Sequence, residues 1–196
     1  MTLRRAALAA PLLLLLLAGC VPSDPVASPT PEPSFTPPPV TPNPTPTITP
    51  TPSAETVPVD FGCEDLFTAQ AIYDYNPNVT LLPSFSPTDS SPAGQAIAQQ
   101  GLACELINQT SGSTIDFGVI RYTDEAYAAK VAAVSGSATP ATAFDGYFDV
   151  TGDGGLAQLF SAPFYVTVNS ADFGTEGDIS RPVAMVLAGL AANPAG

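Results

Sequence analysis

Histidine is absent from this chain of 196 residues, and bases are few: five lysines and arginines stand against eighteen acids, for a formal net charge of −13. The lack of histidine excludes a histidine-activated nucleophile and a histidine-ligated zinc site. An acidic surface repels nucleic acid, so we expect no nucleic-acid partner. The motifs of serine hydrolases, zinc peptidases and phosphate-binding loops are also missing, and no cofactor is expected.

The first twenty residues have the pattern of an export signal. Arg4 and Arg5 form a small positive region, and residues 6–17 are uncharged and rich in leucine. This run is shorter than the roughly 20 apolar residues that cross a bilayer as a helix. These features fit an ordinary secretory signal, for which the cysteine at position 20 would be incidental.

The sequence Leu17-Ala18-Gly19-Cys20 resembles the lipobox of bacterial lipoproteins. The resemblance implies cleavage of residues 1–19 as a signal peptide and a diacylglyceryl group on the sulfur of Cys20. Two acyl chains anchor a protein stably, whereas one chain gives only marginal binding. We therefore expect a lipid-anchored protein on the extracytoplasmic face of the cell membrane.

Residues 20–59 are expected to be a disordered tether between the anchor and the folded part. Residues 21–58 hold fourteen prolines, eight threonines and no glycine, lysine or arginine. Proline lacks a backbone donor and fixes φ, so neither helix nor sheet propagates through such a segment. Extended at about 3.1 Å per residue, it reaches on the order of 100 Å. An inert spacer, a glycosylated stalk and a Pro-rich ligand for another domain all remain open.

Residues 60–196 are long enough for a single domain with its own core. Cys63 and Cys104 are the two cysteines left after lipidation of Cys20. An exported compartment permits disulfides, and an even pair without metal-ligand motifs predicts a bond between them. The alternative, a catalytic thiol, has no histidine base to activate it.

Hydrophobic periodicity and turn residues predict an α+β fold with a mainly antiparallel sheet and helices packed on one face. Most strands follow one another through short turns, as antiparallel neighbours do, and the other face is expected to stay partly open for a partner. The predicted helices cover residues 63–75, 92–100, 124–135 and 181–192, and the predicted strands cover 103–108, 115–122, 146–150, 156–160 and 164–169.

Several short motifs resemble those of a group of small actinobacterial lipoproteins of unknown function. They are Gly101-Leu102-Ala103-Cys104, Asn108-Gln109-Thr110-Ser111-Gly112, and Gly146-Tyr147-Phe148-Asp149 before a glycine turn. Members of this group share a lipobox, a Thr/Pro-rich linker and one cysteine pair. The resemblance therefore implies a location and an architecture, and it brings no known activity.

Two acidic groups are candidates for chemistry. Asp149 and Asp153 with Gly154 match the front half of a calcium loop, although Phe160 stands where its bidentate glutamate belongs. The alternative is a glycine-rich hairpin turn that tolerates aspartate. A second group precedes the last helix, where helix capping is the alternative role of its members Asp172, Glu176 and Asp178.

Other candidates are less specific. Arg121 and Arg181 are candidates for an anion clamp, with surface ion pairs as the alternative. Aromatic residues are candidates for lining a groove, although at least half are expected in the core; they are Tyr73, Tyr75, Tyr122, Tyr147, Phe148 and Tyr165.

The leading hypothesis is a membrane-anchored, non-enzymatic domain that binds a small ligand or another protein of the cell envelope. Two alternatives stay open. One is a hydrolase of cell-wall glycans, which needs two carboxylates about 5 to 10 Å apart in a cleft. The other is a calcium-binding module built on the acidic loops.

Overall fold

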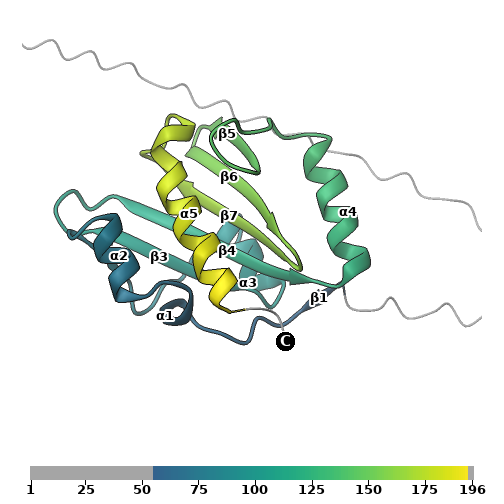
Figure 1. Ribbon diagram of the computed structural model, residues 1–196, viewed down its shortest axis with the longest axis horizontal. Coiled ribbons are helices and arrows are strands. Elements are labelled where there is room, and N and C mark those ends of the chain that lie inside the picture. Colours follow the sequence, from purple (N-terminus) through teal and green to yellow (C-terminus); the bar gives the residue numbers. More distant parts are fainter. Residues whose placement is uncertain (1–54, 194–196) are drawn as a thin grey trace, which may run out of the picture. The chain divides into compact units, whose positions relative to one another are not determined.

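The computed structural model describes residues 55–193, and the predicted signal peptide, Cys20 and most of the predicted tether lie outside them. The described part contains five helices and seven strands (Figure 1). In chain order they are β1 (Thr56–Val57), α1 (Cys63–Leu66), α2 (Ala69–Tyr75), β2 (Val79–Leu81), α3 (Pro92–Ala98), β3 (Leu102–Asn108), β4 (Thr114–Tyr122), α4 (Asp124–Ser135), β5 (Tyr147–Thr151), β6 (Gly154–Ser161), β7 (Phe164–Ser170) and α5 (Glu176–Ala192).

The strands form one antiparallel sheet in the order β2-β3-β4-β7-β6-β5, with β1 paired to the end of β4. Two hairpins, β3–β4 and β5–β6, lie where the sequence predicts them. In each, the strands flank a short glycine-containing turn. The α+β class and the antiparallel sheet are confirmed.

The first face of the sheet carries α1, α2 and α5 and the larger core (Figure 1). Along β4 the inward residues alternate as a half-buried strand requires: Ile115, Phe117 and Val119 face this core. Phe117 is fully buried, and its ring lies 4.5 Å from that of Phe67, measured between centroids. Fully buried residues of α5, Ile179 and Val186 among them, close the core from the helix side.

The second face is also covered by helices, so the prediction that all helices share one face is wrong. Helix α3 lies against β4 at Gly118, where an added Cβ would be 3.0 Å from the carbonyl oxygen of Pro92. Helix α4 buries Val134 in a smaller cluster with Tyr122 and Tyr165. A glycine in the middle of β4 lets a helix backbone approach this face, and the strand pattern alone does not reveal that approach.

The predicted helix over 63–75 is interrupted. Helix α1 ends at Leu66, and α2 begins at Ala69 with Thr68 as its N-cap, whose hydroxyl accepts a hydrogen bond from the backbone N–H of Ala71 at 3.2 Å. Phe67 between them is extended and buried. The chain therefore turns at Phe67 to place its ring in the core, and this tertiary demand overrides helical continuity.

The ordered fold starts before the predicted boundary at residue 60. Thr56 and Val57 pair with Tyr122 and Arg121 of β4, and the backbone N–H of Val59 bonds to the carbonyl of Gln100 at 3.1 Å. Strand β2 likewise lies in a stretch for which the sequence predicts neither helix nor strand. Both strands are very short, and short strands give almost no periodic signal.

Helix α5 begins at Glu176, five residues before the predicted start at Arg181. Its N-terminus is a capping box: Asp178 accepts a hydrogen bond from the backbone N–H of Thr175 at 2.9 Å and one from its hydroxyl at 2.8 Å. Pro182 lies inside the helix and is buried. The expected capping role of Asp178 is confirmed, and the early start places Ile179 in the core.

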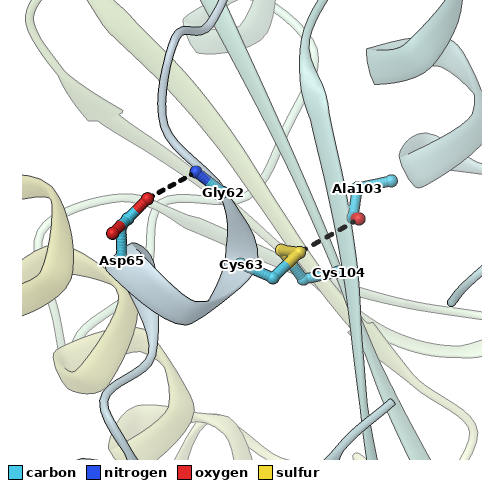
Figure 2. Close-up of a disulfide and its surroundings, with 5 residues drawn as sticks. All are labelled: Gly62, Cys63, Asp65, Ala103 and Cys104. Atoms are coloured by element: carbon cyan, nitrogen blue, oxygen red, sulfur yellow. Dashed lines mark hydrogen bonds between the residues drawn. A yellow bond between two sulfur atoms is a disulfide. The ribbon is translucent and has the colours of Figure 1, made fainter. Parts of the chain in front are cut away.

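The predicted disulfide between Cys63 and Cys104 is present and ties α1 to β3 (Figure 2). Its Cα atoms are 5.8 Å apart, and Cys104 is buried in the main core. The sulfur of Cys63 lies 3.4 Å from the carbonyl oxygen of Ala103, a non-bonded contact because a disulfide sulfur has no proton to donate. Asp65 accepts a hydrogen bond from the N–H of Gly62 at 2.9 Å, which fixes the start of α1.

Helix α5 approaches α1 so closely that Gly189 has no room for a side chain. An added Cβ would lie 2.0 Å from the carbonyl oxygen of Leu66. We expect Gly189→Ala to lower the free energy of unfolding by about 2 to 3 kcal/mol, because the two backbones must separate. Urea unfolding followed by circular dichroism measures this difference.

Gly177 of the same helix is the matched control. An added Cβ there meets only the hydroxyl of Thr175, at an ordinary 3.6 Å. Alanine has the higher helix propensity, so Gly177→Ala should be neutral or stabilise by up to about 1 kcal/mol. Equal losses for the two variants would contradict the close approach of α1 and α5.

Candidate functional site

The second face of the sheet carries a polar cleft of about 500 Å³. One wall is the segment that leads into α3, and the other is the hairpin between β5 and β6. The floor is Leu156 on β6 and Asn169 on β7, which are neighbours in the sheet register. We call this the polar cleft; its lining residues are Thr88, Ser90, Ser91, Pro92, Thr151, Asp153, Leu156 and Asn169.

The first wall is held in place by the start of α3. The Ser91 hydroxyl accepts a hydrogen bond from the N–H of Gly94 at 3.0 Å and donates one to the carbonyl of Thr88 at 2.8 Å. Gly94 is required here, because an added Cβ would lie 2.0 Å from that carbonyl oxygen. Ser91 is the N-cap of α3 and Pro92 is its first residue, so the helix starts at residue 92 as predicted.

The second wall is a tight turn. The hydroxyl of Thr151 donates to the carbonyl of Gly154 at 3.2 Å and accepts from the N–H of Asp153 at 3.3 Å. Gly154 has a φ of +96°, a conformation that side chains other than glycine rarely adopt. The turn thereby holds Asp153 at the rim of the cleft.

Some polar groups of the cleft are exposed to solvent and have no partner among the described residues. The hydroxyls of Thr88 and Ser90 and the carboxylate of Asp153 make no hydrogen bond with any residue in 55–193. The amide nitrogen of Asn169 donates to the carbonyl of Gly155 at 3.0 Å, which leaves its oxygen as an acceptor. The cleft therefore offers two hydroxyls and two acceptors to a ligand.

A pair of carboxyl groups lies on the same face. Glu105 of β3 and Asp116 of β4 are directly opposite in the register. A hydrogen bond between the two carboxyl groups, which needs one proton shared by the pair, is among the causes that raise the pKa of Glu105. One oxygen of Asp116, Oδ1, is buried without a hydrogen-bond partner among the described residues. Asp116 is in turn opposite Asn169, so it lies one strand away from the floor of the polar cleft, and Glu105 lies two strands away.

Burial is the largest cause of the raised pKa values of these two carboxyl groups. It raises the pKa of Glu105 to about 7, helped by the hydrogen bond to Asp116 and the repulsion of its charge. Burial also raises the pKa of Asp116. The pair thus retains a proton at a pH where separate carboxyl groups are ionised.

This shared proton predicts a pH-dependent stability. The folded state binds the proton more tightly than the unfolded chain, so the stabilisation is complete below the ordinary pKa of 4.5 and is lost as pH rises through about 7. Since Glu105 is partly exposed, we expect a loss on the order of 1 kcal/mol between pH 4.5 and 8. Urea unfolding across this range measures it.

Glu105→Gln keeps a hydrogen-bonding side chain of the same size and removes the titration. We expect this variant to be the more stable protein at pH 8 and to have a flatter pH profile than the unaltered chain. Glu64→Gln, at an exposed position of α1, is the matched control and should leave the profile unchanged. A stability that rises from pH 5 to 8 would contradict the shared proton.

The first face also carries cavities, including two larger ones. One of about 440 Å³ lies between α1, α2 and α5, and Arg181 is part of its lining. The guanidinium of Arg181 donates to the carbonyl of Asp74 at 2.7 Å and lies over the ring of Tyr75. Arg181 therefore joins two helices, and Arg121, its predicted partner in an anion clamp, lies on β4.

The other cavity, of about 450 Å³, is an apolar groove between α2 and β2. Tyr73 on its rim is 63 % exposed, whereas Tyr122, Phe148 and Tyr165 are buried as core residues. The expectation that at least half of the named aromatics pack in the core agrees with these positions. Tyr75 and Tyr147 are half-buried.

The predicted calcium candidates Asp149 and Asp153 have different surroundings. Asp149 accepts hydrogen bonds from the hydroxyl of Thr139 at 2.7 Å and from its N–H at 3.3 Å, while Asp153 lies in the polar cleft. Within residues 55–193 no group of three or more acidic, cysteine or histidine side chains is placed to hold a metal ion.

Glu176 accepts three hydrogen bonds from Thr142 and Ala143, which lower its pKa.

Comparison of the chain with protein-family models, curated proteins and solved structures found no match. In the part that the structure describes, no helix is long and apolar enough to cross a membrane. Cys20 lies outside that part, so its lipidation stays a prediction from the sequence.

The polar cleft and the carboxyl pair were not found by sequence reasoning. Glu105 and Asp116 follow no motif, and only the register of β3 with β4 makes them neighbours. The sole local signal was the alternation of polar Glu105 and Asp116 with the apolar residues of their strands.

Proposed function

We propose that this protein is a lipid-anchored lipoprotein of the extracytoplasmic membrane face, and that its folded part binds a ligand without transforming it. The observation that carries the proposal is the lipobox-like Leu17-Ala18-Gly19-Cys20, which follows a positive and then an apolar segment. The Pro/Thr-rich segment after it would present the folded part at a distance from the bilayer.

The disulfide supports an exported location. Structural disulfides persist in oxidising compartments and are rare in a reducing cytosol. Cys63 and Cys104 are both used in this bond, so neither is a free thiol nucleophile. The same observation thus favours export and removes one class of catalysis.

The cleft supports binding. It combines several polar groups with the apolar surface of Leu156 and Pro92, and ligand sites commonly combine apolar surface with a few polar groups. The unpartnered hydroxyls of Thr88 and Ser90 and the carboxylate of Asp153 are available for recognition.

A second candidate, a carboxylate-dependent hydrolase, is favoured by one observation: Glu105 retains a proton near pH 7, as a general acid must. Glu105 and Asp116 are in hydrogen-bond contact, closer than the separation used in glycoside hydrolysis. Release of reducing ends from purified cell-wall glycan, abolished in Glu105→Gln, would favour the hydrolase over the binding domain.

The anchor is tested by mass spectrometry of the full chain expressed in a bacterium and recovered from its membranes. We expect the N-terminal peptide to start at Cys20 and to carry the mass of a diacylglyceryl group. A peptide that starts at Met1, or a Cys20 peptide without added mass, would overturn the proposal.

A further inference from the structure

The polar cleft has a chemical character of its own. Its two unpartnered hydroxyls, Thr88 and Ser90, can each donate or accept a hydrogen bond, while Asp153 and the oxygen of Asn169 accept. Leu156 and Pro92 add apolar surface beside these groups. Such a mixture fits a ligand that carries many hydroxyl groups on a carbon framework with apolar faces.

The charge of the surroundings excludes an anionic ligand. Asp153 lies at the rim of the cleft, Asp116 lies one strand beyond its floor, and Glu105 lies two strands beyond it. None of the three bases of the described part, Arg121, Lys130 and Arg181, is among the lining residues. Phosphorylated or carboxylated ligands would therefore meet repulsion without compensation.

A metal ion is a poorer fit than an organic ligand. Calcium takes six to eight oxygen ligands, and Asp153 is the one carboxylate that lines the cleft. A cavity of about 500 Å³ is instead in the range of sites that enclose small organic molecules.

We propose that the polar cleft between α3 and the β5–β6 hairpin binds a neutral saccharide. This assignment rests on the proposed binding function and specifies its ligand class. Asp153 and Asn169 accept hydrogen bonds from sugar hydroxyls, Thr88 and Ser90 complete the polar ring, and Leu156 contacts a carbon–hydrogen face of a sugar ring.

The test uses the mature full chain, purified in detergent, and saturation-transfer NMR with three neutral probes, chitotriose, maltotriose and mannotriose. We expect saturable transfer from the protein to at least one of them, and none to the anionic trigalacturonate. No transfer to any neutral probe, or equal transfer to the anionic one, would overturn the assignment.

Two variants locate the site. Asp153→Asn and Ser90→Ala each remove one hydrogen-bonding group from the cleft, and we expect each to weaken binding about threefold to tenfold. Asp145→Asn removes the same charge from an exposed position outside the cleft and should bind as the unaltered chain does. Unchanged binding in both cleft variants, with unchanged melting curves, would overturn the assignment.

The experiments distinguish failure of the lipid-anchor proposal from failure of the saccharide assignment. If the protein carries no lipid but binds a sugar, the anchor proposal is wrong and the cleft assignment stands. If the protein is lipidated but binds none of the neutral probes, the cleft assignment is wrong and the anchor proposal stands.

Discussion

Replacing Cys20 by alanine should abolish incorporation of labelled fatty acid and shift the protein out of the detergent phase of a membrane extract. The physical reason is that two acyl chains contribute about 0.8 kcal/mol for each buried methylene, enough for stable anchoring. The remaining apolar run, residues 6–17, is too short to span the bilayer in their place. Phase partition and fatty-acid labelling in the expressing bacterium measure both effects.

The chain offers a matched control for this experiment. It holds three cysteines, and the double variant Cys63→Ala/Cys104→Ala keeps only Cys20. This variant should be labelled as the unaltered chain is, which assigns the lipid to Cys20 alone. Labelling that persists in Cys20→Ala would contradict the anchor.

Removal of the disulfide should be the largest loss of stability in the folded part. The bond joins residues 41 apart, and closing a loop of this length stabilises a protein by about 4 kcal/mol, mainly through the unfolded state. We therefore expect Cys63→Ala/Cys104→Ala to lower the free energy of unfolding by about that amount. Urea unfolding at pH 7 measures it.

Reduction of the unaltered protein provides the control. A reducing agent should lower its stability by a similar amount and should not affect the double variant. Since Cys104 is buried and Cys63 is half-buried, part of the loss in the variant comes from packing rather than from the cross-link. Equal stability with and without the reducing agent would contradict a stabilising role for the bond.

The elements that the sequence predicts well are those with local signals. The β3–β4 hairpin has alternating residues around a turn that contains Gly112, and α4 has acids in its first turn. Ser91 and Pro92 mark the start of α3 within one residue. In each case the residues that determine the element lie inside it.

The sequence predictions are wrong where contacts with distant parts of the chain determine the local structure. Phe67 is extended and not helical because its ring packs on that of Phe117, fifty residues away in the sequence. Helix α3 lies on the second face because Gly118 admits its backbone. Residues 56 and 57 become a strand because β4 extends beyond β3. Composition placed these last two residues in the tether, and their pairing partners are more than sixty residues away.

The candidate site is less predictable than the fold for the same reason. The walls of the polar cleft come from residues 88–92 and 151–153, and its floor comes from two further strands. The carboxyl pair depends on a register in which a slip of one residue would turn Glu105 to the other face. Cys63 and Cys104 were predictable because an exported chain with one such pair leaves them a single partner.

The attachment of the N-terminal segment has a mechanical consequence. If the domain is pulled at Glu55, tension reaches first the two residue pairs that join β1 to β4 and the bond from Thr123 to Glu55. These few hydrogen bonds would break one after another. Local unfolding would stop at Cys63, where the disulfide holds the chain to β3. Tension on the N-terminal segment would thus lengthen it by a few residues through loss of β1, while the other six strands stay paired.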